Sequence, residues 1–198
     1  MVKMNEAYAS TGFNFIYRST SFTVEPELTE NSAVPFNELE VALKTKLRVG
    51  TYQDLNLYFF SWLRDDLLGF CYFPVSNPSD SARLLDGCIN HADSLPGGSF
   101  TNYDLGATAV HEVGHWLGIF HVFQGFSCRG SGDFVPDTPV QSSPSFGCPI
   151  GKDSCPDKKG LDSVHNYMDY SFDACMDHFT PKQGKRMFSR YTAYRKGQ

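Results

Sequence analysis

Long apolar runs and an excess of basic residues are both missing from this 198-residue sequence. The longest apolar candidate, residues 55–63, is interrupted by Asn56 and Ser61 and falls well short of the roughly 20 residues that cross a bilayer. Lys and Arg number 17 against 22 Asp and Glu, for a net charge of -5, whereas nucleic-acid binding depends on clustered basic side chains. We therefore expect no membrane and no nucleic acid as a partner. Nothing in the pattern indicates an oligomer, so we expect a soluble monomer.

The sequence also has no Cys-x-x-Cys pair, so the usual zinc site built from thiolates is not expected. Disulfides are the better explanation for an even set of cysteines, although spacing alone does not choose among the possible pairings. The set is Cys71, Cys88, Cys128, Cys148, Cys155 and Cys175. Disulfides imply an oxidising compartment, and therefore secretion.

Residues 1–10 lack the charged start and apolar core of a signal peptide. Because disulfides imply secretion, we expect the chain to begin after a signal and pro-segment that are absent from it. The folded-looking sequence from Phe13 onward supports this view. A gene model that missed its first exon is the alternative.

Apolar periodicity predicts the regular elements. With 41% hydrophobic residues, the chain can bury one compact core, so we expect a single domain over residues 1–198. Strands are expected at residues 13–24, 55–60, 70–73 and 87–91, and a helix at residues 36–47, after Pro35 and before Gly50. This order predicts a mixed sheet with helices packed on it, in the α/β (α+β) class.

Two further helices carry recognisable start signals. Residues 101–104 have the capping form that begins a helix, and the helix is expected to run to Leu117. Its predicted inward stripe is Leu105, Ala109, Val113, Trp116 and Leu117. Residues 128–159 are dense in Gly, Pro, Ser and Asp and are expected to be irregular. A last helix is predicted to start at Thr180, with Pro181 at its first position and Gln183 completing the cap.

The chemistry is concentrated in residues 111–121, which read His-Glu-Val-Gly-His-Trp-Leu-Gly-Ile-Phe-His. Residues four apart lie on one face of a helix, so the imidazoles of His111 and His115 can converge on one ion. Gly118 can take the left-handed conformation that ends a helix and lets His121 supply a third ligand. Three imidazoles leave the fourth position for water, as in catalytic rather than structural zinc sites. Glu112, turned away from the metal, is expected to act as general base on that water.

This pattern is the metzincin signature. The sequence resembles the metzincins, and within them the pappalysin-like (cytophagalysin, M43-type) group, which includes secreted fungal and bacterial metalloproteases. The resemblance covers about residues 50–190 and is carried by residues 95–98, 101–124, 132–133, 137–139 and 165–170. It implies a secreted zinc metalloendopeptidase that hydrolyses internal peptide bonds of protein or peptide substrates. It also implies an upper subdomain of sheet and helices over about residues 1–118 and an irregular, disulfide-stapled lower subdomain over about residues 119–198.

The resemblance assigns roles to residues outside the zinc motif. Met168 would form the hydrophobic floor beneath the metal, and Tyr170 would lie near the metal, where it could donate to a developing oxyanion. The implied disulfides are Cys128–Cys155 and Cys148–Cys175, and we expect Cys71 to pair with Cys88 between neighbouring strands. Calcium is a further implied ion, with Asp133, Asp137 and Thr138 as candidate oxygen ligands. A role of the two acids in forming turns is the alternative.

The strand at residues 87–91 would form the upper rim of the cleft, with a free edge for an extended substrate. Two other functions stay open at this point. One is a zinc-binding interaction module without catalysis, against which the presence of Glu112 argues. The other is metal-dependent hydrolysis of a non-peptide amide or ester.

Overall fold

The computed structural model describes residues 1–24, 37–64 and 67–198. Its helices are α1 (Val2–Tyr8), α3 (Glu38–Leu47), α4 (Asp80–Leu85), α5 (Ala107–Trp116) and α6 (Pro181–Tyr194), with short 3₁₀ turns η1 (Ala9–Thr11) and η2 (Ala92–Ser94). Its strands are β1 (Leu57–Phe60), β2 (Gly69–Cys71) and β3 (Cys88–His91). The predicted mixed sheet with packed helices is confirmed. Among the described residues, no helix combines the length and apolar character that a membrane crossing demands.

The strands form one small sheet in the order β1-β3-β2, with β3 parallel to β1 and antiparallel to β2. The prediction that residues 87–91 have a free edge is therefore wrong. All four residues of β3 are buried, because a strand paired on both sides and covered on both faces has no exposed edge. The strand edge beside the zinc motif belongs to β2 instead.

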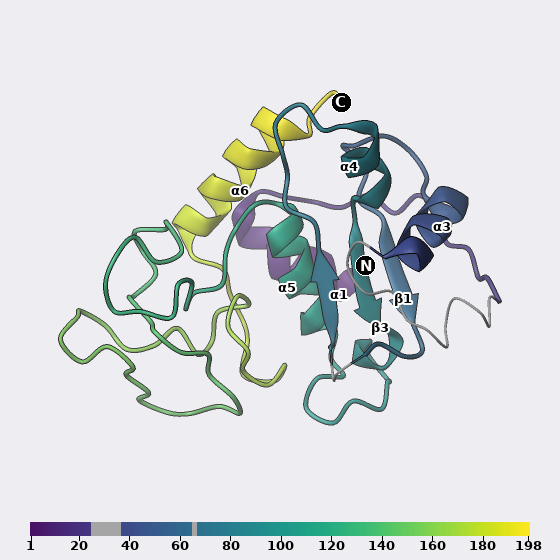
Figure 1. Ribbon diagram of the computed structural model, residues 1–198. Coiled ribbons are helices and arrows are strands. Elements are labelled where there is room, and N and C mark those ends of the chain that lie inside the picture. Colours follow the sequence, from purple (N-terminus) through teal and green to yellow (C-terminus); the bar gives the residue numbers. More distant parts are fainter. Residues whose placement is uncertain (25–36, 65–66) are drawn as a thin grey trace.

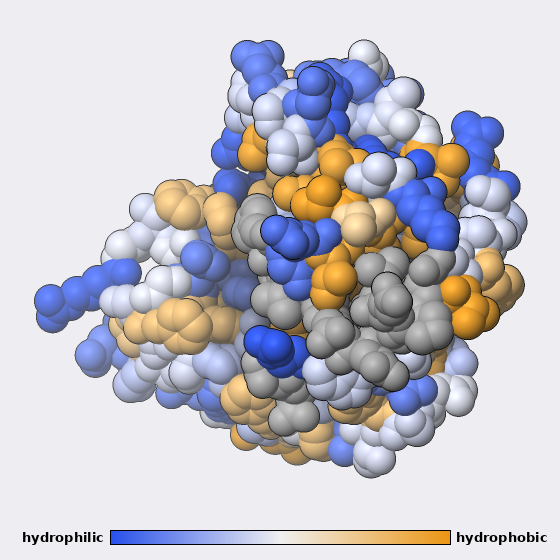
Figure 2. Space-filling view, turned by 45° about the vertical axis from the view of Figure 1, so that its right-hand side comes forward, coloured by the Kyte–Doolittle hydropathy of each residue, from blue (hydrophilic) through white to orange (hydrophobic). Residues whose placement is uncertain are grey.

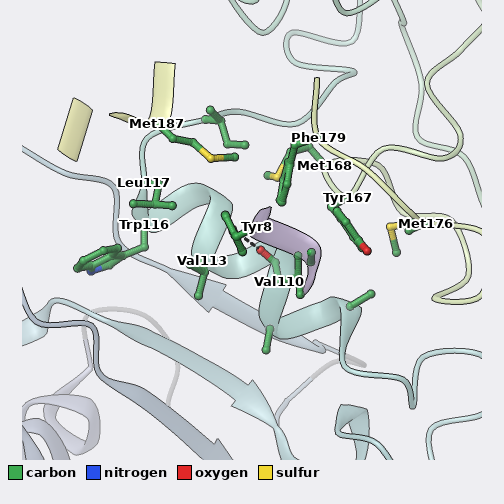
Figure 3. Packing of buried hydrophobic residues seen from close by; sticks show 14 of the residues in the cluster. Tyr8, Val110, Val113, Trp116, Leu117, Tyr167, Met168, Met176, Phe179 and Met187 are labelled. Atoms are coloured by element: carbon green, nitrogen blue, oxygen red, sulfur yellow. Dashed lines mark hydrogen bonds between the residues drawn. The ribbon is translucent and has the colours of Figure 1, made fainter. Parts of the chain in front are cut away.

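Two apolar clusters lie on opposite faces of the sheet. One joins Leu43 of α3 to Tyr58, Phe60 and Ile89 of the strands. The other surrounds α5, which lies across the sheet in Figure 1, and includes residues of α1 and α6. Figure 3 shows this second cluster, in which the hydroxyl of Tyr8 donates to the carbonyl of Val110 at 2.8 Å. Helix α1 was not predicted, although it fixes the flank of α5.

The start of α5 differs from the prediction. The helix begins at Ala107 after Gly106, whose φ of 84° stops the helix from extending backward, and no side chain of residues 101–104 caps it. The carboxylate of Asp173 accepts from the backbone N–H groups of Leu105 and Ala107 at 2.8 and 3.1 Å. A distant acid therefore supplies the cap, and Leu105, 45% exposed, is not part of the inward stripe.

The strand predicted at residues 13–24 is also absent, since these residues form neither a strand nor a helix. Phe13 and Phe15 alternate because they pack against the cluster around α5, whereas Ile16 and Tyr17 are exposed. Phe36, where the next helix was expected to begin, lies outside the described residues. That helix is observed from Glu38, with Asn37 as its cap.

The segment from Leu117 to Thr180 contains no helix and no strand, only an isolated bridge between Asn166 and His178. It forms the green loops to one side of α5 in Figure 1. Disulfides Cys128–Cys155 and Cys148–Cys175 lie within it, while Cys71–Cys88 joins β2 to β3. These are the expected pairings. Helix α6 then begins with the predicted capping box of Thr180 and Gln183.

The surface shown in Figure 2 is mixed in character. Hydrophilic residues interrupt the apolar ones over the displayed face. The residues that indicate a function are therefore the buried polar residues of α5, not those on this face.

Candidate metal centre

Three imidazoles meet at the end of α5. His111 and His115 lie one turn apart on the helix, and the chain then bends at Gly118, whose φ is 89°. A side chain at Gly118 would also collide with Arg190 of α6 at 2.9 Å. The bend brings His121 back, so that the three Nε2 atoms lie 3.0 to 3.1 Å from one another.

The hydrogen bonds of two rings determine their tautomers. Nδ1 of His111 lies 2.7 Å from the carbonyl oxygen of Tyr167, and Nδ1 of His115 lies 2.9 Å from that of Ile119. A carbonyl only accepts, so each Nδ1 carries the proton and each Nε2 presents a lone pair. Burial, with a smaller contribution from the neighbouring rings, lowers the pKa of all three histidines to about 3. The rings are therefore neutral at physiological pH.

These donors fit a zinc ion. Neutral nitrogens that face one another at 3.0 to 3.1 Å repel unless a cation lies between them. Three nitrogens this close together are compatible with bonds of roughly 2.0 to 2.1 Å to one zinc ion, so His111, His115 and His121 would hold it. Cys148, His165 and Cys175 also converge, but the two sulfurs form a disulfide and offer no thiolate.

Glu112 lies beside the imidazoles and lines the same cleft. Its side chain is buried, and burial raises its pKa to about 8. One carboxylate oxygen, Oε2, is buried without a hydrogen-bond partner. This carboxylate can therefore accept a proton or interact with a nearby positive charge.

Met168 has no exposed surface. Figure 3 shows it beside α5 in the apolar cluster. A side chain on Gly114 would lie only 2.6 Å from the sulfur of Met168, so a glycine in the middle of the helix is needed for this approach. The backbone N–H of Met168 donates to the side-chain oxygen of Asn166 at 3.0 Å, which fixes the turn.

Tyr170 lies on the open side of the imidazoles. Its hydroxyl is 3.2 Å from Nε2 of His121, and its side chain is partly exposed. Burial and the nearby Glu112 raise the pKa of the phenol, so it stays protonated and able to donate. The phenol of Tyr170 is thus a hydrogen-bond donor that lines the cleft.

The cleft has a volume of about 220 Å³ and is lined by Gly69, Phe70, Cys71, His111, Glu112, His115, His121 and Tyr170. The three residues of β2 were not predicted as part of the site. A glycine within a strand often marks a close approach of another group, and Gly69 carried that signal. The sequence just before Gly69 has no periodic pattern that would have aligned β2 with α5.

The candidate calcium ligands are divided between two places. Asp133 is buried and accepts from the hydroxyl of Thr138 at 2.8 and 2.9 Å, beside a second cavity of about 220 Å³. The carboxylate of Asp137 instead accepts from the hydroxyl of Thr180 at 2.7 Å and from the N–H of Lys182 at 3.0 Å. Asp137 therefore caps the start of α6.

Comparisons with known proteins show what the whole chain is similar to. The model of peptidase family M43, described as pregnancy-associated plasma protein-A, matches residues 53–191. The chain is 51% identical over 195 residues to an extracellular metalloprotease of Pyricularia oryzae, covering 98% of this chain and 66% of that protein. It is 51% identical over 193 residues to an extracellular metalloprotease of Neurospora crassa, covering 97% and 65%. The chain thus spans just under two thirds of these relatives.

A solved structure is similar as well. Mature mirolysin of Tannerella forsythia in complex with a cleaved peptide shares 36% sequence identity with the chain. The superposition has a TM-score of 0.65 and covers 77% of this chain and 58% of that chain.

Proposed function

Because the chain belongs to peptidase family M43, we propose that it is a secreted zinc-dependent endopeptidase that cleaves internal peptide bonds of proteins or peptides. The relatives are named extracellular metalloproteases, and three disulfides fit an oxidising compartment. The observation that carries the proposal is the convergence of three Nε2 atoms beside a buried carboxylate in an open cleft. We further propose that residues 1–198 act as one monomeric catalytic domain, with the cleft between its upper and lower parts.

His111, His115 and His121 would hold the metal. When bound, zinc supplies Lewis acidity, which lowers the pKa of a water toward about 7 and polarises a carbonyl. Two hydrogen bonds support this role, since the carbonyls of Tyr167 and Ile119 accept from Nδ1 of His111 and His115 and orient these rings. Met168 would support the site from below, where it packs under Gly114.

Glu112 would accept a proton from the attacking water and pass it to the leaving amine. A base must be ionised, and burial alone holds the pKa of Glu112 at about 8. A divalent cation between the neighbouring imidazoles favours the ionised carboxylate, so metal binding and activation of the base are coupled. In this way Glu112 would act at neutral pH only in the metal-loaded protein.

Tyr170 would donate its phenolic proton in a hydrogen bond to the carbonyl oxygen as negative charge develops there. Its raised pKa keeps that proton in place at neutral pH. The hydroxyl is 3.2 Å from Nε2 of His121, which supports a position beside the reacting carbonyl.

An extended substrate would pair with the outer edge of β2. This strand bonds to β3 on one side only, and its three residues line the cleft. Backbone pairing holds a peptide of almost any sequence, which suits an endopeptidase. The β2 edge takes the place that the sequence had suggested for residues 87–91.

Calcium is a second proposed ion, and its proposed site has fewer side-chain ligands than the sequence suggested. Asp133 and Thr138 line a cavity together with residues 130–132 and 135–136. Oxygen ligands of this kind suit calcium. The carboxylate of Asp137 bonds to the start of α6, so Asp137 would not be a calcium ligand. It would instead hold the loop that carries Asp133 and Thr138.

The proposal is tested with a peptide library and purified protein in the presence of zinc. The wild type should cleave within extended peptides, and Glu112→Ala should abolish cleavage while zinc content stays the same. Glu6→Ala, at an exposed position of α1, is the matched control and should leave cleavage unchanged. Cleavage that persists in Glu112→Ala contradicts the role of the base. A wild type that retains zinc but hydrolyses only non-peptide esters or amides, or nothing, favours one of the alternative functions.

A further inference from the structure

Asn90 lies at the centre of β3, where it has no exposed surface. Cys88, two residues earlier, belongs to the cluster around α5, and side chains two apart on a strand share a face. The amide of Asn90 therefore lies on the side of the sheet that α5 covers. Its direct partner across the ladder is Gly69 of β2.

This amide is left without a hydrogen-bond partner at both of its polar atoms, Nδ2 and Oδ1. Oε2 of Glu112 is also buried and unpartnered. Unsatisfied polar groups in a protein interior are destabilising, so native structures rarely keep several together. Asn90 offers two donor hydrogens, and the carboxylate of Glu112 offers only acceptors.

Gly69 shows that the two groups share one space. A side chain built on Gly69 would place its first carbon 3.0 Å from Cγ of Glu112 and 3.1 Å from Oδ1 of Asn90. Both side chains thus approach the same point, which stays open because residue 69 is glycine. The atoms nearest to that point are Oδ1 of Asn90 and Cγ of Glu112, so a rotation of the amide or one buried water would be needed to join Nδ2 to the carboxylate.

We infer that Asn90 is a positioning residue for Glu112, donating from Nδ2 to Oε2 directly or through one buried water. The bond would fix the inner oxygen of the carboxylate and leave the outer oxygen directed at the cleft. A hydrogen bond to an ionised group is short and strong, so it limits the rotation of the base. This inference rests on the proposed role of Glu112. It also requires glycine at position 69, because a side chain there would fill the space that both groups approach.

Kinetics give the first test. Asn90→Leu, close in size but without polar atoms, should lower kcat about tenfold and leave KM and zinc content unchanged. Asn56→Leu is the matched control, because Asn56 is also a buried amide, whose partners are backbone atoms of Val49 and Asp54. It should reduce stability without changing kcat. Equal kcat for Asn90→Leu and the wild type, in folded protein, overturns the inference.

A second readout needs neither activity nor folding of the Asn90 variant. In zinc-loaded protein, where the carboxylate of Glu112 is ionised, the side-chain amide protons of Asn90 should resonate downfield and exchange slowly in NMR spectra. Glu112→Ala should return them to the ordinary range. Resonances unchanged by Glu112→Ala contradict the bond between the two residues. A wild type without peptidase activity would instead refute the proposed function, and the NMR comparison would still decide whether Asn90 contacts Glu112.

Discussion

The two parts of the molecule that meet at the cleft are ordered by different means. Around α5 and the sheet, apolar side chains pack against regular elements, and all ten residues of α5 are buried. Between Leu117 and Thr180 there is no helix or strand, and order comes from two disulfides and from polar side chains that bond to the backbone. The converging imidazoles come mainly from the first part, whereas Met168 and Tyr170 come from the second.

Asp169 illustrates how the irregular part is built. Its buried carboxylate accepts from the side chain of Gln141 at 2.9 Å and from the backbone N–H of Ser145 at 2.8 Å. Asn166 and Gln183 exchange two amide hydrogen bonds at 2.8 and 3.0 Å. Such bonds satisfy the backbone where no ladder does so, and they hold the residues next to Met168 and Tyr170 in place.

The largest effect is expected in the part of the molecule built from helices and strands, at its buried ion pair. Arg195, with no exposed surface, bonds both oxygens of Asp86 at 2.8 and 2.9 Å. Arg195→Leu leaves the buried Asp86 with only the indole N–H of Trp116 at 3.0 Å and the guanidinium of Arg48 at 3.9 Å. The free energy of unfolding should therefore fall by about 3 to 5 kcal/mol in a urea titration. The exposed Arg129, changed to Leu, is the control and should cost little. A loss for Arg195→Leu no larger than that of the control would show that packing alone supports this part.

The irregular part should depend on its disulfides to a similar degree. Cys148→Ser with Cys175→Ser opens a loop with a sequence separation of 27, which should lower the free energy of unfolding by about 3 to 4 kcal/mol. Removing Cys71–Cys88 should cost less, because these two residues already pair in the ladder. Urea titration gives the losses, and limited proteolysis should cut first within residues 122–180 of the first variant. Equal losses for the two disulfides would contradict this contrast.

Tyr170 tests what the irregular part contributes to catalysis. Tyr170→Phe keeps the ring and removes the donor, so kcat should fall about a hundredfold. Zinc content and the unfolding midpoint should stay as in the wild type, and Tyr17→Phe, at an exposed position, serves as the control. An unchanged kcat would restrict Tyr170 to packing.

The smallest expected effect concerns pH. Burial raises the pKa of Asp133 from 3.8 to about 6 in the folded protein. Folding therefore favours the protonated acid, and its contribution is present below pH 3.8 and is lost as pH rises through about 6. Asp133→Asn should thus gain about 2 kcal/mol relative to the wild type at pH 7 and little at pH 4 in a urea titration with a chelator present. A gain that is the same at both pH values would contradict burial as the cause.

Local signals in the sequence predicted the parts of the fold that depend on neighbours in the chain. The spacing of His111, Glu112 and His115 and the capping box at Thr180 were correct, because one helical turn contains all the atoms involved. Residues 101–104 were wrongly predicted to cap α5, because Asp173, far along the chain, takes that role. Likewise, nothing near β3 indicates that β2 lies outside it, since pairing order depends on contacts between distant segments.

The site followed the same division. The three histidines and Glu112 could be predicted from the motif, whereas Gly69 and Asn90 depend on the register between two strands. An amide at a buried strand position, such as Asn90, contradicts the usual apolar pattern, and the sequence alone gives no reason for it. The reason appears only when the fold shows that Glu112 lies near Asn90. Residues of this kind are found only once the fold places them together.

The central claim is that three neutral imidazoles bind one divalent ion. Zinc titrated calorimetrically into metal-free wild type should bind with one ion per chain, and His115→Ala, which removes the ring that both neighbours face, should lose this binding while circular dichroism remains native. If folded wild-type protein binds no zinc, or if His115→Ala binds it equally well, the metal centre described above is wrong.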